Sequence, residues 1–265
     1  MRIPIEQLAA FADAPFEGNP AAVCMLQAWL PDPLMQAIAA ENNLSETAFI
    51  VNEGNGYGLR WFTPQCEVDL CGHATLAAAQ VIFNQSPEST RLHFNTRSGE
   101  LQVDRDGERL RLNFPAQVVQ PCPMPEGLVE ALGATPECCL MGVDLIAVFA
   151  SEGCIQALSP TMTALAKLPG RGVIVTAPGN SVDMVSRFFA PGIGIPEDPV
   201  TGSAHCSLAP YWATRLGKPK LEAQQLSNRG GRLQCEVKSD RVLISGRVQP
   251  FLKGELILPS AGKSA

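Results

Sequence analysis

The sequence predicts a mixed α/β (α+β) protein made of two pseudo-symmetric halves that arose by internal duplication. The block RWFTPQCEVDLCGHATLA at residues 60 to 77 returns in outline as RFFAPGIGIPEDPVTGSAHCSLA at residues 187 to 209. A second pair, RSGELQV at residues 97 to 103 and RGGRLQC at residues 229 to 235, follows each block at nearly the same distance. In both halves an aromatic, β-prone segment leads through a glycine turn into an alanine-rich run typical of a helix.

The first half is predicted to start its repeated unit with a strand at residues 58 to 64, which ends in a proline. A central helix follows over residues 72 to 83, with Cys71 near its N-cap. Residues 100 to 114 then read as a hairpin that turns at Asp106–Gly107.

The second half repeats this order, starting with a strand at residues 184 to 191. Its central helix is predicted over residues 203 to 216, with Thr201 near the N-cap. Pro210 should either bend this helix or fall in its first turns. Residues 232 to 246 are the counterpart hairpin. Each half is therefore expected to wrap its strands around one central helix.

The Pro-rich segment FPAQVVQPCPMP at residues 114 to 125 predicts a linker between the halves. We expect an N-terminal repeat domain over residues 1 to 117 and a C-terminal repeat domain over residues 118 to 251. The tail reads as a strand, and residues 252 to 265 are expected to return to the first domain.

Composition restricts the classes of function. The 265 residues carry a net charge of −6 without a basic block, which argues against nucleic acid and membranes as partners. No apolar run is long enough to span a bilayer, and Glu6 and Asp13 interrupt the apolar stretch that a signal peptide needs. Nine cysteines without a regular framework predict reduced thiols in a cytoplasmic protein. The sequence also lacks the motifs of nucleotide-binding proteins and serine hydrolases.

The glycine turn occurs twice, as CGHA at residues 71 to 74 and as TGSA at residues 201 to 204. A helix N-terminus presents unpaired N–H groups and a partial positive charge, and glycine there lets a ligand approach the backbone. Such a turn can hold a carboxylate or an enolate. Two of them flanking one substrate would suit the transfer of a proton from one carbon to another.

Five motifs follow one another along the chain: GNPAAV, NLSETAF, RWFTP, EVDLCGHAT and EDPVTGSAH. Together they resemble the PhzF family of phenazine-biosynthesis-type isomerases over nearly the whole chain, least between residues 120 and 170. The resemblance implies the duplicated fold of diaminopimelate epimerase and proline racemase, with each half a strand barrel around a helix. It also implies an active site between the halves and no cofactor.

The same resemblance implies the site residues. Glu46 of the SETAF motif matches the catalytic acid–base residue of the family, and His73 and Asp198 match further catalytic positions. Substrate-binding positions are expected at Asn19, Cys71, Gly72, Thr201, Gly202 and Ser203, where the two glycines and the serine supply backbone donors.

Glu46 can also be interpreted from its own surroundings. In the expected strand LSETAFIV it shares a face with Leu44, Ala48 and Ile50. A carboxylate on an apolar face is desolvated, which suits a base that acts on a carbon acid. The spacing by itself equally allows an exposed Glu46 and a core formed by the other face.

Other polar residues have two interpretations each. His73 could be a structural hydrogen-bonding residue, and Asp198 could cap a turn. Asn19 could contact substrate or adopt a left-handed turn, and the turn is the preferred interpretation. His205 is expected inside the second helix in a packing or capping role, and His93 on an exposed strand.

Cys71 supports the main competing hypothesis. Two-thiol racemases of this fold place a cysteine at the start of each helix, and here the second position is Thr201. An epimerase or dehydratase of an amino-acid-like substrate, centred on Cys71, stays open, although Glu46 argues against it. A binding protein that keeps the fold without turnover is a further alternative. The spacing of Cys66, Cys71 and His73 is not a usual zinc pattern, so no metal site is expected.

The sequence thus predicts a cofactor-independent isomerase that moves a proton between carbons of a small carboxylate-bearing molecule. Glu46 would take the proton, and N–H groups of the two turns would hold the conjugated intermediate. Glu46, His73 or Asp198 would return the proton. Besides this small molecule, a second copy of the chain is an expected partner, in a homodimer.

Overall fold

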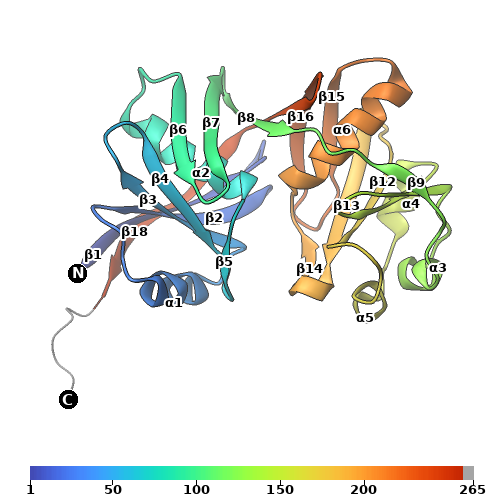
Figure 1. The fold of residues 1–265 in the computed structure, drawn as a ribbon, viewed down its shortest axis with the longest axis horizontal. Coiled ribbons are helices and arrows are strands. Elements are labelled where there is room, and N and C mark those ends of the chain that lie inside the picture. Colours follow the sequence, from blue (N-terminus) through green and yellow to red (C-terminus); the bar gives the residue numbers. More distant parts are fainter. Residues whose placement is uncertain (259–265) are drawn as a thin grey trace. The chain divides into compact units, whose positions relative to one another are not determined.

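The computed structural model describes residues 1 to 258, which form two compact units (Figure 1). Unit 1 contains Met1–Ala10, Pro20–Leu112 and the described residues from Arg247 onward. Unit 2 contains Phe11–Asn19 and Asn113–Gly246.

Residues 11 to 19 pack with unit 2, although the sequence-based division leaves them in the first domain. The Gly18 amide donates to the Gly230 carbonyl at 2.7 Å, and the Arg232 amide donates to the Phe11 carbonyl at 3.0 Å. A short piece of the first half therefore completes the second unit. The domain bounds expected at residues 117 and 251 stay a prediction.

Unit 1 wraps its strands around helix α2 (Gly72–Gln85), which contacts β1, β3, β7 and β18 (Figure 1). Helix α1 (Asp32–Asn42) packs on β3 and β4. The strands are β1 (Arg2–Ala10), β2 (Asn19–Leu26), β3 (Glu46–Asn52), β4 (Tyr57–Phe62), β5 (Glu67–Val68), β6 (Arg91–Thr96), β7 (Gly99–Asp106), β8 (Arg109–Pro115) and β18 (Val248–Ile257).

The pairing order in unit 1 starts with β2 and β3, which are parallel. β3 and β4 are antiparallel, and β4 runs parallel to β6. β6, β7 and β8 then form an antiparallel meander. β18 pairs antiparallel with β1, and both strands belong to unit 1. Residues 259 to 265 of the expected tail lie outside the described residues.

β3 is buried on both faces. Phe49 and Val51 pack in an apolar cluster with Met35 and Ile38 of α1. Because side chains alternate along a strand, Ala48 and Ile50 point to the opposite face, and both are fully buried. β3 therefore lies between a layer that contains α1 and a layer that contains α2. Glu46 is on the same face of β3 as Ala48 and Ile50.

Unit 2 repeats this arrangement around helix α6 (Gly202–Leu216), which contacts β15, β16 and β17 (Figure 1). Its strands are β9 (Gln120–Cys122), β10 (Cys138–Met141), β11 (Leu145–Val148), β12 (Val173–Pro178), β13 (Met184–Ala190), β14 (Ile195–Asp198), β15 (Lys220–Gln225), β16 (Gly231–Lys238) and β17 (Arg241–Gly246). Shorter helices are α3 (Leu128–Leu132), α4 (Glu152–Ala157), α5 (Met162–Leu165) and the 3-10 turn Pro191–Ile193.

The order of pairings in unit 2 matches that of unit 1. β11 and β12 are parallel, β12 and β13 antiparallel, β13 and β15 parallel, and β15, β16 and β17 form an antiparallel meander. Each step has its counterpart in β2, β3, β4, β6, β7 and β8. The predicted fold class, two duplicated α/β halves, is therefore confirmed.

Two matching arginines show the duplication in side-chain detail. Arg60 binds Glu67 through two bonds of 2.7 and 2.6 Å, and Arg187 binds Glu197 through two bonds of 2.7 and 3.0 Å. Each guanidinium also lies over the phenylalanine two residues later, at 5.2 and 4.9 Å from the ring centre. The repeated blocks thus share side-chain contacts as well as amino-acid sequence.

Some local expectations need correction. The segment at residues 114 to 125 is not a plain linker, because it contains β9, which pairs with β10. Pro210 lies inside α6, beyond its first turns, so of the two expected roles the bend in the helix is the one that stays a prediction. The nine cysteines are all free. Within residues 1 to 258, no helix has both the length and the apolar character that a membrane span requires.

Candidate active site

Glu46 is the first residue of β3, and the end of α1 fixes its place. Helix α1 ends at Asn42, and its C-cap Asn43 has a left-handed backbone (φ 49°) that turns the chain back toward the sheet. The Asn42 side chain then donates a hydrogen bond to Thr47 Oγ1 at 3.0 Å. β2 runs alongside, with Ala21 in register with Glu46. The Glu46 carboxylate therefore projects from the start of a strand that pairs with β2 on one side and with β4 on the other.

The turn before α2 forms as the sequence predicts, with Cys71 at the N-cap in an extended conformation. The N–H and the hydroxyl of Thr75 both donate to the Cys71 carbonyl, at 3.1 and 2.6 Å. The Cys71 side chain makes no capping hydrogen bond. Since the first N–H groups of a helix have no partner within the helix, those of Gly72 and His73 can serve a ligand.

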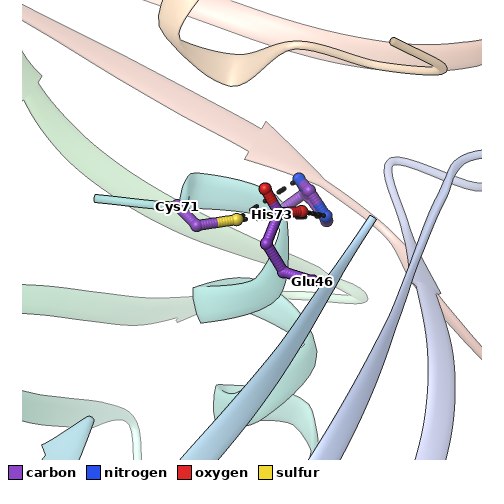
Figure 2. A group of neighbouring side chains, drawn as sticks. All are labelled: Glu46, Cys71 and His73. Atoms are coloured by element: carbon purple, nitrogen blue, oxygen red, sulfur yellow. Dashed lines mark hydrogen bonds and ion pairs between the residues drawn. The ribbon is translucent and has the colours of Figure 1, made fainter. Parts of the chain in front are cut away.

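The side chains of Glu46, Cys71 and His73 meet at this turn (Figure 2). His73 Nε2 lies 2.9 Å from Glu46 Oε2, and the Cys71 sulfur lies 3.5 Å from His73 Nδ1. Exposure is low, at 7% for the histidine side chain and 12% for the glutamate. The expected catalytic pair of unit 1 is thus in direct contact.

The contact between His73 and Glu46 is an ion pair that lacks the alignment of a hydrogen bond. Among the residues that the structure describes, Glu46 Oε2 makes no well-aligned hydrogen bond, although this oxygen is buried and His73 Nε2 is close to it. A buried carboxylate oxygen without an aligned hydrogen bond is energetically costly, and such groups concentrate at functional sites. Glu46 Oε2 therefore keeps a lone pair that can accept a proton.

The charges in this group depend on burial and on each other. Burial raises the pKa of the Cys71 thiol to about 11, and the Glu46 charge adds to the increase, so the thiol is protonated at neutral pH. Burial opposes a charged His73, but its contacts with Cys71 and Glu46 outweigh this and hold its pKa well above the usual range. With Cys71 neutral, the Glu46 carboxylate is the charge that stabilises the imidazolium.

The same three side chains offer possible metal-ligating atoms that lie within 4.8 Å of one another, close enough for one metal ion. Thiolate, imidazole and carboxylate are all zinc ligands. The site lies at a helix N-terminus, however, where the partial positive charge of the helix disfavours a cation. Binding would also displace protons from Cys71 and His73, whose raised pKa values oppose that loss.

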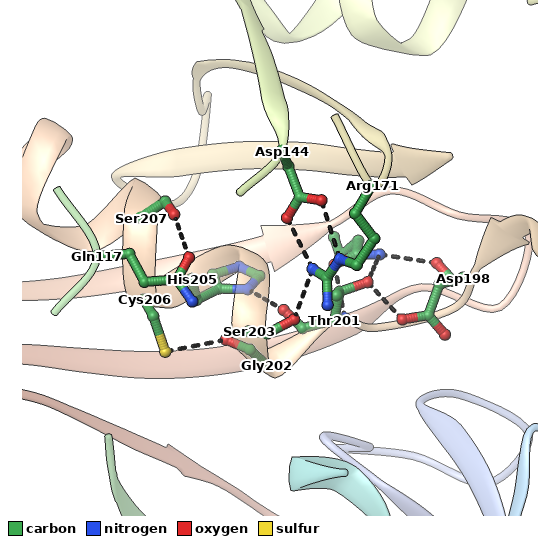
Figure 3. A network of polar contacts seen from close by, with 11 residues as sticks. Gln117, Asp144, Arg171, Asp198, Thr201, Gly202, Ser203, His205, Cys206 and Ser207 are labelled. Atoms are coloured by element: carbon green, nitrogen blue, oxygen red, sulfur yellow. Dashed lines mark hydrogen bonds and ion pairs between the residues drawn. The ribbon is translucent and has the colours of Figure 1, made fainter. Parts of the chain in front are cut away.

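Unit 2 holds its helix turn with a different set of contacts (Figure 3). Thr201 is the N-cap of α6, as predicted. Its hydroxyl donates to Asp198 Oδ2 at 2.5 Å, and its N–H donates to Gln225 Oε1 at 2.9 Å. The Gln225 amide donates in return to the Asp198 carbonyl at 2.7 Å. Asp198 is thus a structural part of the turn, and its expected catalytic role stays a prediction.

Asn19 belongs to this network rather than to a left-handed turn. Its amide donates to Asp198 Oδ1 at 2.8 Å and to the Val200 carbonyl at 2.9 Å, and the residue is fully buried. The left-handed residue is its neighbour Gly18 (φ 74°). The preferred interpretation of Asn19 is therefore wrong, because the amide is needed to satisfy buried acceptors.

Two histidines have the roles that the sequence predicts. His205 lies inside α6, fully buried, with Nδ1 2.8 Å from the Thr201 carbonyl. Burial lowers its pKa to about 4, so it is neutral and donates through Nδ1. His93 lies on β6, where Nδ1 is 3.0 Å from Glu100 Oε1 and the side chain is 42% exposed.

Sequence reasoning missed one charged group at the α6 turn. Arg171 binds Asp144 through two bonds of 3.0 and 2.7 Å and donates to Ser203 Oγ at 3.0 Å (Figure 3). Arg171 lies just before β12, and Asp144 just before β11. The only available signal was a single arginine in LPGRG, next to the segment of weakest resemblance.

The fold and the group of Glu46, Cys71 and His73 define the class of duplicated α/β proteins that carry polar groups at two helix starts. A family model described as phenazine biosynthesis-like protein matches residues 8 to 254. The chain therefore belongs to the phenazine biosynthesis-like, or PhzC–PhzF, family.

Individual relatives agree with this membership. A Pseudomonas aeruginosa protein described as an uncharacterized isomerase is 54% identical, over 97% of this chain and 100% of its own length. The crystal structure of a PhzF family protein from Enterococcus faecalis has a TM-score of 0.95 and 50% identity, covering 97% of this chain and 100% of its own.

A more distant structure shares the fold alone. A hydroxyproline epimerase from Agrobacterium vitis has a TM-score of 0.65 at 10% identity, covering 96% of this chain and 91% of its own. The duplicated architecture expected from the resemblance to epimerases is thus present in this chain.

Proposed function

We propose that the protein is an isomerase in which Glu46 removes a proton from a carbon next to a carboxylate or a double bond. The observation that carries the proposal is the buried contact between Glu46 Oε2 and His73 Nε2 at 2.9 Å, which leaves that oxygen without a well-aligned hydrogen bond. The description of a 54% identical relative as an isomerase supports the same reaction class.

In the proposed reaction, the substrate C–H bond breaks as its proton moves to Glu46. The electron pair left on carbon spreads into the neighbouring unsaturation and gives an anionic, conjugated intermediate. First-turn N–H groups at Gly72, Gly202 and Ser203 are proposed to stabilise this charge. The proton then returns to another carbon from Glu46, directly or through His73 or Asp198.

His73 is proposed to tune Glu46. As an imidazolium it places a positive charge beside the Glu46 carboxylate, and it can donate its own proton at the end of the reaction. The resemblance to the family implies that the groups of both units act on one substrate in a cleft between the halves, without a cofactor. A structure with a bound substrate would test the shared cleft. The homodimer that the sequence analysis expects is a separate proposal, and the molecular mass measured in solution would test it.

Proton exchange tests the proposal even while the product is unidentified. Small carboxylic acids that have a C–H bond next to unsaturation are incubated with the protein in D₂O and followed by proton NMR. The parent protein should exchange the acidic proton of its substrate, and Glu46→Gln should lose the exchange. Glu41→Gln is the matched control, because Glu41 is an exposed residue of α1. Exchange by Glu46→Gln at the parent rate would refute the assignment.

One observation favours a second candidate, an epimerase or dehydratase based on Cys71. The Cys71 sulfur lies 3.5 Å from His73 Nδ1, a distance at which a neutral imidazole, unlike an imidazolium, could take the thiol proton. The raised pKa of Cys71 speaks against a resident thiolate. The Glu46 assignment therefore has the stronger physical support.

A further inference from the structure

The sheet register identifies which residue of unit 2 occupies the place of Glu46. Glu46 immediately precedes the β3 residue that lies opposite Phe62. Gly172 immediately precedes the β12 residue that lies opposite Phe189. Since Phe62 and Phe189 are matching residues of the repeated blocks, Glu46 and Gly172 are equivalent positions.

Unit 2 has no room for a carboxylate at that position. A Cβ atom on Gly172 would lie 2.7 Å from a ring carbon of Phe188 and 2.8 Å from the Phe189 carbonyl oxygen. The Phe188 ring is buried and the Phe189 oxygen belongs to the backbone, so a side chain there would require both to shift. The neighbouring residue, Arg171, carries the charge instead, with the opposite sign.

Arg171 also repeats the contact that Glu46 makes. Glu46 reaches His73, the second residue of α2, at 2.9 Å. Arg171 Nη2 donates to the hydroxyl of Ser203, the second residue of α6, at 3.0 Å. Each unit therefore places one charged side chain against the second residue of its central helix, an acid in unit 1 and a base in unit 2.

The guanidinium of Arg171 is fixed in place, yet it keeps free donors (Figure 3). Asp144, whose side chain is 1% exposed, accepts bonds from Nε and Nη2, and the guanidinium lies 5.3 Å from the ring centre of Phe188. Within residues 1 to 258, Nη1 has no hydrogen-bond acceptor, and the Arg171 side chain is 37% exposed. Ser203 Oγ accepts from Arg171, so its own proton is left for another acceptor.

We propose that Arg171, together with Ser203, binds the carboxylate of the substrate. Nη1 and the Ser203 hydroxyl supply two donors, and the guanidinium supplies the charge, which is the recognition that arginine gives a carboxylate. Asp144 is a positioning residue, because it acts only by holding the guanidinium. This site would hold the carboxylate of the substrate in the reaction proposed above, and in that respect it rests on the proposed function. The binding itself does not require Glu46 to be the base.

Simple anions and their neutral analogues test the charge recognition. Binding of acetate and benzoate is compared with that of acetamide and benzamide by ligand-observed NMR, at constant ionic strength. The parent should bind each carboxylate at least about tenfold more tightly than its amide, the scale of one charge-assisted hydrogen bond. Arg171→Gln should remove most of this preference without changing amide binding, and Arg171→Lys should restore part of it.

Further variants separate this site from general effects. Arg232→Gln is the matched control, because Arg232 is an exposed arginine of the same unit. Asp144→Asn should weaken carboxylate binding and leave amide binding unchanged. Glu46→Gln should keep the preference for carboxylates, which separates this proposal from the proposed base. The proposal is overturned if a folded Arg171→Gln retains the parent's preference, or if the parent shows no preference.

Discussion

His73 and Glu46 form a buried ion pair between the first turn of α2 and the first residue of β3, with 2.9 Å between Nε2 and Oε2. This pair ties a central helix to the strand that runs beside it. Because each charge is largely removed from water, the pair should control both the ionisation of the site and part of its stability.

Replacing Glu46 by glutamine should bring the raised pKa of His73 down toward or below its usual range. Burial opposes the imidazolium, while Cys71 and the Glu46 charge favour it, so the loss of the Glu46 charge shifts the balance toward the neutral ring. NMR titration of the histidine ring signals measures this directly. In the parent, His73 should remain charged above pH 7, and a parent His73 that titrates near pH 6.5 would contradict the assignment.

The same pair predicts how stability depends on pH. A histidine with a raised pKa contributes stability that is fully present below its unfolded pKa of about 6.5 and is lost as pH rises through the folded pKa. The free energy of unfolding of the parent, minus that of Glu46→Gln, should therefore decrease from about pH 6.5 upward. Urea unfolding at several pH values measures it. An increasing difference over that range would show that His73 is not charged in the folded protein.

Cys71→Ser should leave the proposed turnover within a few-fold of the parent. At neutral pH the Cys71 thiol is protonated because burial raises its pKa to about 11, so it is neither a nucleophile nor a base. Labelling by iodoacetamide at pH 7, followed by mass spectrometry, should modify exposed Cys66 and Cys138 well before Cys71. A loss of about three orders of magnitude in Cys71→Ser would instead support the thiol-based alternative.

Asn19 and Asp198 should be coupled in their effects on stability. Asp198→Ala removes a carboxylate that accepts from Asn19 and Thr201, and it should cost about 2–4 kcal/mol of unfolding free energy. Asn19→Ala removes the donor of two bonds, to Asp198 and to the Val200 carbonyl, and should cost about 1–3 kcal/mol. The double variant should lose less than the sum of the two, by about 0.5 kcal/mol or more. Strict additivity would argue against the hydrogen bond.

His205 should make the protein sensitive to acid. Its folded pKa is lowered to about 4 by burial, while its unfolded pKa is about 6.5. The unfolded chain therefore binds the proton first, and stability falls as pH decreases from about 6.5 to about 4, by about 3 kcal/mol in all. Urea unfolding of His205→Asn should show a smaller decrease over this range. An unchanged pH dependence in the variant would contradict the burial of a neutral imidazole.

The sequence predicted the duplicated fold because the repeated information is local. Each half has an aromatic strand, a glycine turn and an alanine-rich helix in the same order, and these elements keep their types in the structure. Cys71 and Thr201 were placed correctly at the helix starts for the same reason. The grouping of Glu46 with His73 needed the family motifs, because the two residues are far apart in the chain.

Contacts that depend on long-range register could not be predicted. Residues 11 to 19 join unit 2 through hydrogen bonds to residues 179 or more positions away, which no local pattern shows. Asn19 was misinterpreted for this reason, since its partners are Asp198 and Val200. Arg171 was missed because its significance arises only when β11 and β12 lie side by side and bring Asp144 next to it.

Gly172 has a consequence for how the two halves could diverge. The ring of Phe188 and the Phe189 carbonyl occupy the space that a side chain would need. A single substitution at this codon therefore cannot return unit 2 to a copy of unit 1 with its own acid. An acid at this position would also require the Phe188 ring and the backbone at Phe189 to move, so the asymmetry between the halves is built into the packing of unit 2.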